Sequence, residues 1–259
     1  MLMTDSPPEK PNAEQVPLHP WSGLAPEHFD LLRLSPLPVD RHTGARPLRF
    51  VELGRIERHS PELSMLRLVV NLPDQHLRKA RNMLEVWVDH RSKEVRFGPD
   101  SGLQVEPPNR GLGRFLMAQG IAWVRQKWTH YRVEGGALPA KDALNDEMRL
   151  RRDHALKAQG FTVTYLDSLQ MKATYGAGHV SELHADWHDQ KVQYIGLAEA
   201  AMMLQQADQN LQHQALELRK LEERVDIYKR DDSGLRFTIA CLVAFAVFQA
   251  GLLIWIATR

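Results

Sequence analysis

The sequence lacks several features that would assign it to a common class of protein. It holds a single cysteine, Cys241, so no disulfide can form within one chain, and we expect the soluble part to occupy a reducing compartment. Lysine and arginine total 33 against 32 aspartates and glutamates. Because this balance gives no overall basic field, we expect no nucleic-acid partner. The N-terminus, MLMTDSPPEKPNAEQ, also lacks the apolar core of a secretion signal, so we expect no cleaved leader.

Proline is unevenly distributed, since nine of the 15 prolines lie in residues 1–47. A proline cannot donate a backbone hydrogen bond, so such a stretch disfavours regular structure. We therefore predict a mostly irregular tether over 1–47. Within it, APEHFDLLRL (25–34) is expected to form one short helix that docks on the next domain through Phe29, Leu32 and Leu34.

Residues 48–170 alternate between strand-like and helix-like patterns and are expected to form one globular domain. β-Branched and aliphatic residues mark the strands, and apolar residues at helical spacing mark the helices. The expected order is strands at 65–72, 84–90, 93–99 and 102–107, a helix at 111–127, a strand at 131–139, a helix at 144–160 and a strand at 161–167. This order predicts an α/β (α+β) domain with a mixed sheet and flanking helices. Gly160 is expected to cap the second helix.

A glycine-containing loop precedes the first of these helices, in the run EPPNRGLGRFLM (106–117). The first backbone N–H groups of a helix have no partner within the helix, and the helix dipole adds partial positive charge there. Gly111 and Gly113 let a phosphate approach the backbone, while Arg110 and Arg114 supply charge beside it. The loop is therefore a candidate phosphate site, although the same pattern is also that of a tight turn before a helix.

The run of strand, glycine loop, helix, strand, helix and Gly160-Phe161 resembles the GNAT superfamily of acyl-CoA-dependent N-acetyltransferases over about residues 65–167. The resemblance implies a GNAT-like fold in which loop amides hold the pyrophosphate of acetyl-CoA, or of another acyl-CoA, at a helix N-terminus. It also implies that the acyl-pantetheine arm enters between the fourth and fifth strands, where Gly135-Gly136 would mark a bulge. The cofactor-binding residues that it implies are Arg110, Gly111, Leu112, Gly113 and Arg114.

The chain departs from the family pattern at three positions. The leading Arg or Gln of the loop motif falls on Pro108. The tyrosine that often acts as general acid for the departing thiolate falls on Leu156, and a frequent asparagine falls on Arg149. The loop that would hold the cofactor is thus better preserved than the residues that would use it.

Amine acetylation also needs a base that takes a proton from the ammonium group. Glu106, at the end of the fourth expected strand, and Glu134, in the fifth, are the candidate catalytic bases by position. The alternative is that both are plain strand carboxylates, exposed or paired. Tyr131 and Tyr165 are the available substitutes for the missing acid. The second helix also carries three arginines that would either contact a phosphate of CoA or face solvent, namely Arg149, Arg151 and Arg152.

Residues 171–192 are polar and rich in histidine, and we predict a linker there. His184 and His188 stand at the i, i+4 spacing that two helical zinc ligands use. Because the sequence has no HExxH motif and no cysteine nearby, a solvated linker is favoured over a metal site.

Two helical segments are expected after the linker. Residues 193–231 carry apolar residues at seven-residue intervals, the pattern of one coiled-coil position: Leu197, Leu204, Leu211, Leu218 and Val225. We expect a homo-oligomer through this helix, the alternative being a leucine stripe packed on its own domain. Residues 237–258 hold no charged side chain and are long enough to span a hydrocarbon core of about 30 Å. The basic residues that precede this span favour a cytoplasmic N-terminal side.

These observations lead to one prediction and one rival. The chain is expected to be a single-pass, C-terminally anchored, GNAT-like N-acyltransferase with its domain in the cytoplasm, in a bacterial inner membrane. It would transfer an acyl group, acetyl by preference, from CoA to an amine acceptor. The rival function is a catalytically inactive GNAT-fold module for interaction or assembly, which the coiled coil dimerises at the membrane.

Overall fold

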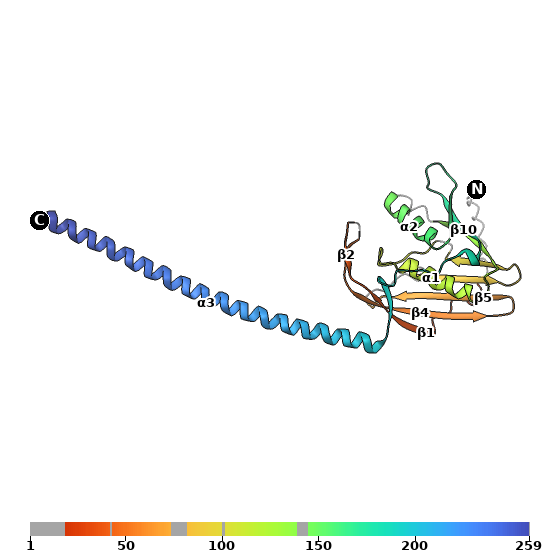
Figure 1. The fold of residues 1–259 in the computed structure, drawn as a ribbon, viewed down its shortest axis with the longest axis horizontal. Helices are drawn as coiled ribbons and strands as arrows, with labels where there is room; N and C mark the ends of the chain where they lie inside the picture. Colours follow the sequence, from red (N-terminus) through yellow and green to blue (C-terminus); the bar gives the residue numbers. More distant parts are fainter. Residues whose placement is uncertain (1–18, 42, 74–81, 100–101, 139–144, 259) are drawn as a thin grey trace, which may run out of the picture. The chain divides into compact units, whose positions relative to one another are not determined.

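The computed structural model describes residues 19–41, 43–73, 82–99, 102–138 and 145–258 (Figure 1). The chain divides into two compact units, Met1–Ile195 and Gly196–Arg259. The first unit contains a large β-sheet with two helices, and the second is helical.

The first unit is built on a nine-stranded sheet in the order β11-β1-β4-β5-β6-β7-β8-β10-β9 (Figure 1). Its strands are β1 (His28–Leu34), β4 (Arg49–His59), β5 (Leu63–Asn71), β6 (Met83–Asp89), β7 (Glu94–Gly98), β8 (Arg132–Leu138), β9 (Thr162–Tyr165), β10 (Ala173–His179) and β11 (Val192–Ile195). Among the described pairs, β7 and β8 run parallel and all others antiparallel. The predicted mixed sheet is therefore confirmed.

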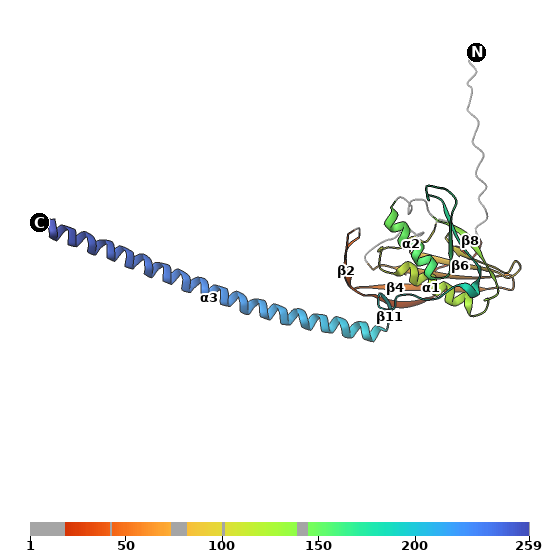
Figure 2. The same ribbon diagram turned by 45° about the horizontal axis from the view of Figure 1, so that its top comes forward.

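Two helices, α1 (Leu112–Arg125) and α2 (Asp146–Ala158), lie on one face of this sheet (Figure 2). The apolar stripe of α1 packs into the core against β5, β6 and β7. Gly120 lets α1 approach the sheet closely, because a Cβ at this position would lie 2.9 Å from a methyl group of Val86. The stripe consists of Phe115, Leu116, Ile121 and Val124, all fully buried.

Helix α2 has a side-chain cap at its start and a glycine at its end. The Asn145 side chain accepts two backbone hydrogen bonds from the first turn. At the other end Gly160 has a φ of +89°, and the N–H groups of Gly160 and Phe161 donate to the carbonyls of Lys157 and Leu156 at 3.0 and 3.1 Å. This is the Schellman arrangement, so the predicted glycine cap is confirmed.

Residues 28–46 differ from the irregular tether that we expected. The segment expected as a helix is strand β1, in which Leu32 and Leu34 are fully buried while Leu31 is only half-buried. This period of two fits a strand that pairs with β4 on one side and β11 on the other. The next residues form a two-stranded hairpin of β2 (Leu37–Asp40) and β3 (Gly44–Arg46). Residues 1–18 of the expected tether lie outside the described residues.

Two further expectations are corrected by the structure. The fourth expected strand, 102–107, is a loop in its described residues, since Pro107 and Pro108 cannot donate to a strand ladder. Residues 171–192 are part of the domain instead of a linker, because they contribute β10 and a 3-10 turn, η2 (Val180–Glu182), to it. Burial of apolar side chains holds this segment on the domain, since Val180 is fully buried in the core.

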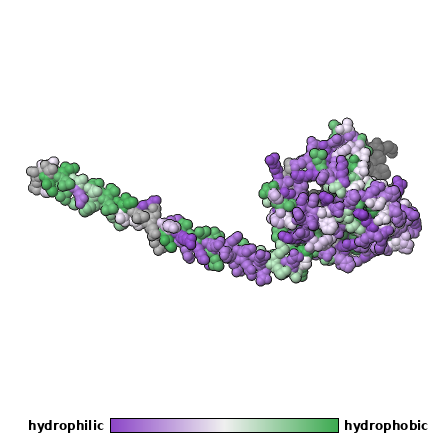
Figure 3. Space-filling view, in the orientation of Figure 1, coloured by the Kyte–Doolittle hydropathy of each residue, from purple (hydrophilic) through white to green (hydrophobic). Residues whose placement is uncertain are grey.

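The second unit is one helix, α3 (Leu197–Thr258). It starts after residue 193 because Val192–Ile195 pair with β1 as a strand. Its segment Arg236–Ile256 is long and apolar enough to span a membrane by length and composition, and Figure 3 shows the apolar surface of this part. The predicted apolar C-terminal helix is thus confirmed. The structure does not show a long coiled coil over 193–231, which stays a prediction.

Candidate functional site

A basic cavity of about 1160 Å³ lies in the first unit, which is large enough for a nucleotide-sized ligand. Four parts of the chain line it: the loop before α1 with the first turn of that helix, the β2–β3 hairpin with the start of β4, α2, and the segment before β11. Among the described residues, two carboxylates contribute to the lining, Asp40 and Glu106. The cationic side chains that line it are Arg46, Arg49, Arg110, Arg114, Arg151, Arg152 and Lys191. This imbalance of charge favours an anionic ligand.

The N-terminus of α1 opens on the basic cavity without a side-chain cap. Gly111 is the N-cap residue, and no described side chain accepts a hydrogen bond from the first turn, which also carries no acidic residue. The first hydrogen bond within the helix runs from the N–H of Phe115 to the carbonyl of Gly111 at 3.0 Å. The amides of Leu112, Gly113 and Arg114 precede it, and such amides together with the helix dipole favour an anion.

The two glycines of this loop meet different needs. Gly111 has a φ of +84°, a conformation that favours glycine, and a Cβ there would lie 3.5 Å from the Lys191 side chain. Gly113 has no such φ, and a Cβ there would make ordinary contacts of 3.7 and 3.8 Å with Val105 and Leu103. The fold therefore requires glycine at 111 more strongly than at 113.

Arg110 is a buried cation in the wall of the basic cavity. Its residue is 2% exposed, and its Nη2 donates to the carbonyls of Leu34 and Ser35, each at 3.0 Å. Burial lowers the pKa of this guanidinium, and the nearby charges of Arg49 and Arg46 lower it further. The side chain thus ties the loop to the end of β1 and concentrates positive charge at this wall.

Arg114 holds a neutral histidine at the cavity. Its Nε donates to the carbonyl of Asp186 at 3.0 Å, and its Nη1 lies 3.3 Å from Nε2 of His188. A guanidinium can only donate, so this nitrogen of His188 must accept and the ring must be neutral. Burial lowers the pKa of His188, and the charges of Lys191 and Arg114 add to the effect. The accepting nitrogen of the ring is therefore already occupied by Arg114.

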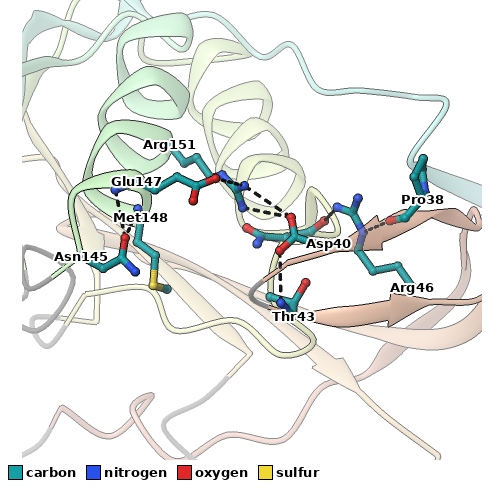
Figure 4. Close-up of polar contacts among 9 residues, drawn as sticks. Pro38, Asp40, Thr43, Arg46, Asn145, Glu147, Met148 and Arg151 are labelled. Carbon is teal, nitrogen blue, oxygen red and sulfur yellow. Dashed lines mark hydrogen bonds and ion pairs between the residues drawn. The ribbon is translucent and has the colours of Figure 1, made fainter.

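An ion pair joins the β2–β3 hairpin to α2 across the cavity (Figure 4). Both terminal nitrogens of Arg151 lie 3.4 Å from Oδ2 of Asp40, and Arg151 also pairs with Glu147 on its own helix. The N–H of Thr43 donates to Oδ1 of Asp40 at 3.1 Å. The Asp40 side chain is only 9% exposed, so this carboxylate is held inside the wall.

The two carboxylates predicted as bases lie in different places. Glu106 lines the basic cavity, and its backbone is fixed by the buried Asn82, whose side chain accepts from the Glu106 N–H at 2.5 Å and donates to its carbonyl at 2.9 Å. Glu134 is exposed on β8 and is not among the residues that line the cavity. The structure therefore brings one of the two predicted bases to the cavity.

None of the three positions considered for a general acid lies in the cavity lining. Leu156 is buried in the core at 9% exposure. The hydroxyl of Tyr165 donates to Asp153, and burial and this bond raise the pKa of Tyr165. The buried Tyr131 has its hydroxyl 3.3 Å from Nδ1 of His90.

The seam between β7 and β8 holds a tyrosine that sequence analysis did not single out. The two strands pair at only two described positions, after which the hydroxyl of Tyr175 donates to the carbonyl of Phe97 on β7 at 3.1 Å. The Tyr175 ring comes from β10 and passes over β8 at Gly136, where a Cβ would lie 2.6 Å from the ring. Glycine is therefore required at position 136 because the Tyr175 ring lies too close to the backbone for a side chain.

Sequence analysis also missed much of the cavity wall. It did not identify Arg46, Arg49 or Lys191, and it treated His188 only as a metal ligand to be weighed against a linker. These residues come from segments far apart in the sequence, which the pairing of β1 with β4 and β11 brings together. Among the described residues, no group of three or more His, Cys, Asp or Glu side chains is placed to hold a metal ion.

Comparison with known proteins does not add an assignment. No protein-family model matches the chain, and no curated protein or solved structure is similar enough to count as a match.

Proposed function

We propose that the chain is a membrane-anchored N-acyltransferase that moves an acyl group, acetyl by preference, from CoA to an amine. The observation that carries the proposal is the basic cavity, in which seven cationic side chains surround the uncapped N-terminus of α1. A carrier with several phosphate groups, such as CoA, has the negative charge that would neutralise these cations. The GNAT resemblance adds support, because α1, β8, α2 and Gly160-Phe161 follow the cavity loop in the order that it implies, while the fourth strand that it places before this loop is not formed.

Each part of the cavity has a role in this proposal. The amides of Leu112, Gly113 and Arg114 bind the pyrophosphate of the acyl-CoA. The amine lone pair attacks the thioester carbonyl carbon, the carbon–sulfur bond breaks, and its electron pair leaves on the sulfur. The proton that the acylated nitrogen loses passes to this thiolate, which leaves as the free thiol of CoA. Glu106, which lines the cavity, is the proposed base that first takes the ammonium proton.

The rival proposal is a catalytically inactive module for interaction or assembly. It is favoured by the residues considered as general acids. Leu156 lies in the core, and the hydroxyl of Tyr165 donates a hydrogen bond to Asp153. Such a module would keep the fold, with or without cofactor binding, and lose turnover.

Ligand binding is tested by thermal unfolding of the full-length chain in a mild detergent with and without millimolar acetyl-CoA. A ligand that binds only the folded state raises the melting temperature, by a few degrees at about 100 times its Kd. Gly113→Glu should abolish the rise, because the position accommodates a side chain and the carboxylate would occupy the anion site. Gly113→Gln is the matched neutral control. No rise in the unmodified chain refutes the CoA proposal.

Turnover separates the enzyme from the inactive module. The readout is release of free CoA thiol from acetyl-CoA in the presence of a panel of small amines and lysine peptides. Glu106→Gln is expected to lower the rate by about 10²-fold or more if Glu106 is the base, while the thermal shift with acetyl-CoA remains. Binding without any thiol release would favour the inactive module.

We further propose that α3 anchors the chain in a membrane and associates with a second copy through its apolar residues at seven-residue spacing. Supporting this, Leu197, Leu204 and Leu211 are all more than half exposed. Analytical ultracentrifugation of residues 1–231 and 1–195 tests the association. The shorter chain ends at 195 because β11 belongs to the sheet. Monomer masses for both chains would refute the coiled coil.

A further inference from the structure

Three arginines form a cluster at one wall of the basic cavity, which we call the arginine cluster. Arg46 ends β3, Arg49 begins β4 and Arg110 lies in the loop before α1, and all three line the cavity. Their charges act on one another, since Arg49 and Arg46 both disfavour the charged form of Arg110. Like charges gathered in this way destabilise the unliganded site and are relieved by an anion.

The neutral partners of the arginine cluster leave its charge uncompensated. Arg46 donates to the carbonyls of Pro38 and Asn109 at 2.8 and 3.1 Å, and Arg110 donates to two further carbonyls. Among the described residues, no ion pair involves a member of the cluster. The nearby carboxylate of Asp40 is instead paired with Arg151.

A second observation marks the cluster as a built site. Arg110 is 2% exposed, and its Nε has no hydrogen-bond partner among the described residues. Burial of a guanidinium beside two others is costly unless a ligand returns the lost interactions. The cluster also lies on the β1 side of the loop, because Arg110 reaches the carbonyls of Leu34 and Ser35. Lys191 lies beside the same segment, because the N–H of Ser35 donates to its carbonyl at 3.0 Å, whereas Arg114 is directed to His188.

We propose that the arginine cluster binds a second phosphate group of the ligand, a phosphate monoester separate from the pyrophosphate at the α1 N-terminus. A monoester carries a charge of about −1.5 to −2 at pH 7 and three acceptor oxygens. The planar guanidinium matches such a group with two parallel hydrogen bonds. The inference rests on the proposed function and deepens it, because CoA carries such a monoester on its ribose and 3′-dephospho-CoA does not. The site then selects the phosphorylated carrier.

The test compares the Kd of CoA and of 3′-dephospho-CoA by isothermal titration calorimetry on the full-length chain in detergent. The unmodified chain should bind CoA about tenfold or more tightly, the range of one or two charge-assisted hydrogen bonds. Arg49→Gln should bring the ratio of the two Kd values close to one, because it weakens the binding of CoA much more than the binding of 3′-dephospho-CoA. Arg49 suits the test because it is exposed and no hydrogen bond of its side chain is found among the described residues.

Two controls keep the result interpretable. Arg125→Gln removes the same charge from an exposed residue outside the cavity lining and should change neither Kd. Arg46→Lys keeps the charge but loses the planar guanidinium that can form two parallel hydrogen bonds. It should therefore partly lower the preference for CoA over 3′-dephospho-CoA. Melting temperatures report whether each variant is folded.

Three outcomes contradict the inference. If the unmodified chain binds both ligands equally, or if Arg49→Gln weakens both equally, the arginine cluster does not bind the monoester, while CoA binding itself stands. If neither ligand binds, the proposed function and this inference fail together.

Discussion

Among single residues, Gly160 shows most directly why one residue type is required. It lies at φ +89°, and a Cβ there would be 2.3 Å from the carbonyl oxygen of Glu182. Gly160→Ala should therefore lower the free energy of unfolding by about 2–4 kcal/mol, from backbone strain and overpacking together. Urea denaturation followed by tryptophan fluorescence measures the change.

Gly113→Ala is the matched control for this prediction. The position has no positive φ, and the nearest atoms would lie 3.7 Å from an added Cβ. Because alanine favours a helix over glycine by up to about 1 kcal/mol, this variant should be neutral or slightly more stable. Equal destabilisation by the two substitutions would show that the left-handed turn at Gly160 is not a special constraint.

A second residue-scale prediction concerns pH and His188. Burial, Lys191 and Arg114 lower the pKa of His188 below its ordinary value of 6.5, so the unfolded chain binds this proton more readily than the folded chain. The contribution to stability is therefore complete above pH 6.5 and is lost as the pH falls from 6.5 through the lower folded pKa. Among the other described groups that act on the ring, His154 also lowers the pKa of His188 and Asp189 raises it.

Urea denaturation at pH 7.5 and at pH 5.5 measures this effect. The full-length chain should lose more stability between the two pH values than His188→Asn, because asparagine does not titrate. His213→Asn, on the exposed surface of α3, is the control and should leave the pH dependence as it is. An identical pH dependence in the unmodified chain and in His188→Asn would contradict the assignment.

At the scale of elements, the ion pair between the β2–β3 hairpin and α2 reduces the net positive charge of the cavity. Asp40 is one of two carboxylates that line the cavity in the described part of the chain, and it engages Arg151. Asp40→Asn should tighten acetyl-CoA binding severalfold, because it removes a repulsive charge and releases Arg151 for the phosphates. The change in stability should stay near 1 kcal/mol or below, since Arg151 is 40% exposed.

Glu147→Gln provides the comparison for the ion pair. It removes the other carboxylate partner of Arg151, on the same helix but outside the cavity lining. Calorimetric titration of acetyl-CoA should give a Kd closer to that of the unmodified chain than Asp40→Asn does. If the two variants change the Kd equally, the effect comes from Arg151 alone and not from the charge inside the cavity.

Elements differ in how far the sequence predicts them, and the reason is the range of the interactions that form them. The stripe of α1 and the cap at Gly160 depend on neighbours within one or two turns, so local patterns are sufficient. Strand β1 is buried by its pairing with β4 and β11, which are distant in sequence. The local sequence does not show these partners, so its leucines alone predicted a short helix. Local pattern placed Glu106 and Arg110 at the site, whereas Arg49 and Lys191 reach it only through sheet pairing.

At the scale of the whole molecule, α3 determines where the protein resides if its apolar segment enters a bilayer. Arg236–Ile256 has a mean hydropathy of 2.4 and is long enough for the hydrocarbon core. We predict that the full-length chain floats with liposomes in a density gradient and that a chain ending at residue 231 stays at the bottom. Burial of the apolar segment in lipid is the driving force, so high salt should not release the full-length chain.

A single charge tests whether the segment spans the bilayer or only adsorbs to it. Val247 lies near the middle of Arg236–Ile256, where an arginine costs about 2.5–3.5 kcal/mol on insertion scales. Val247→Arg should therefore reduce the inserted fraction strongly, while Val225→Arg, on the same helix before the segment, should not. Protection of the segment from protease in sealed vesicles measures insertion. Equal protection of both variants would contradict a spanning helix, because a helix lying at the interface can place an arginine in water at either position.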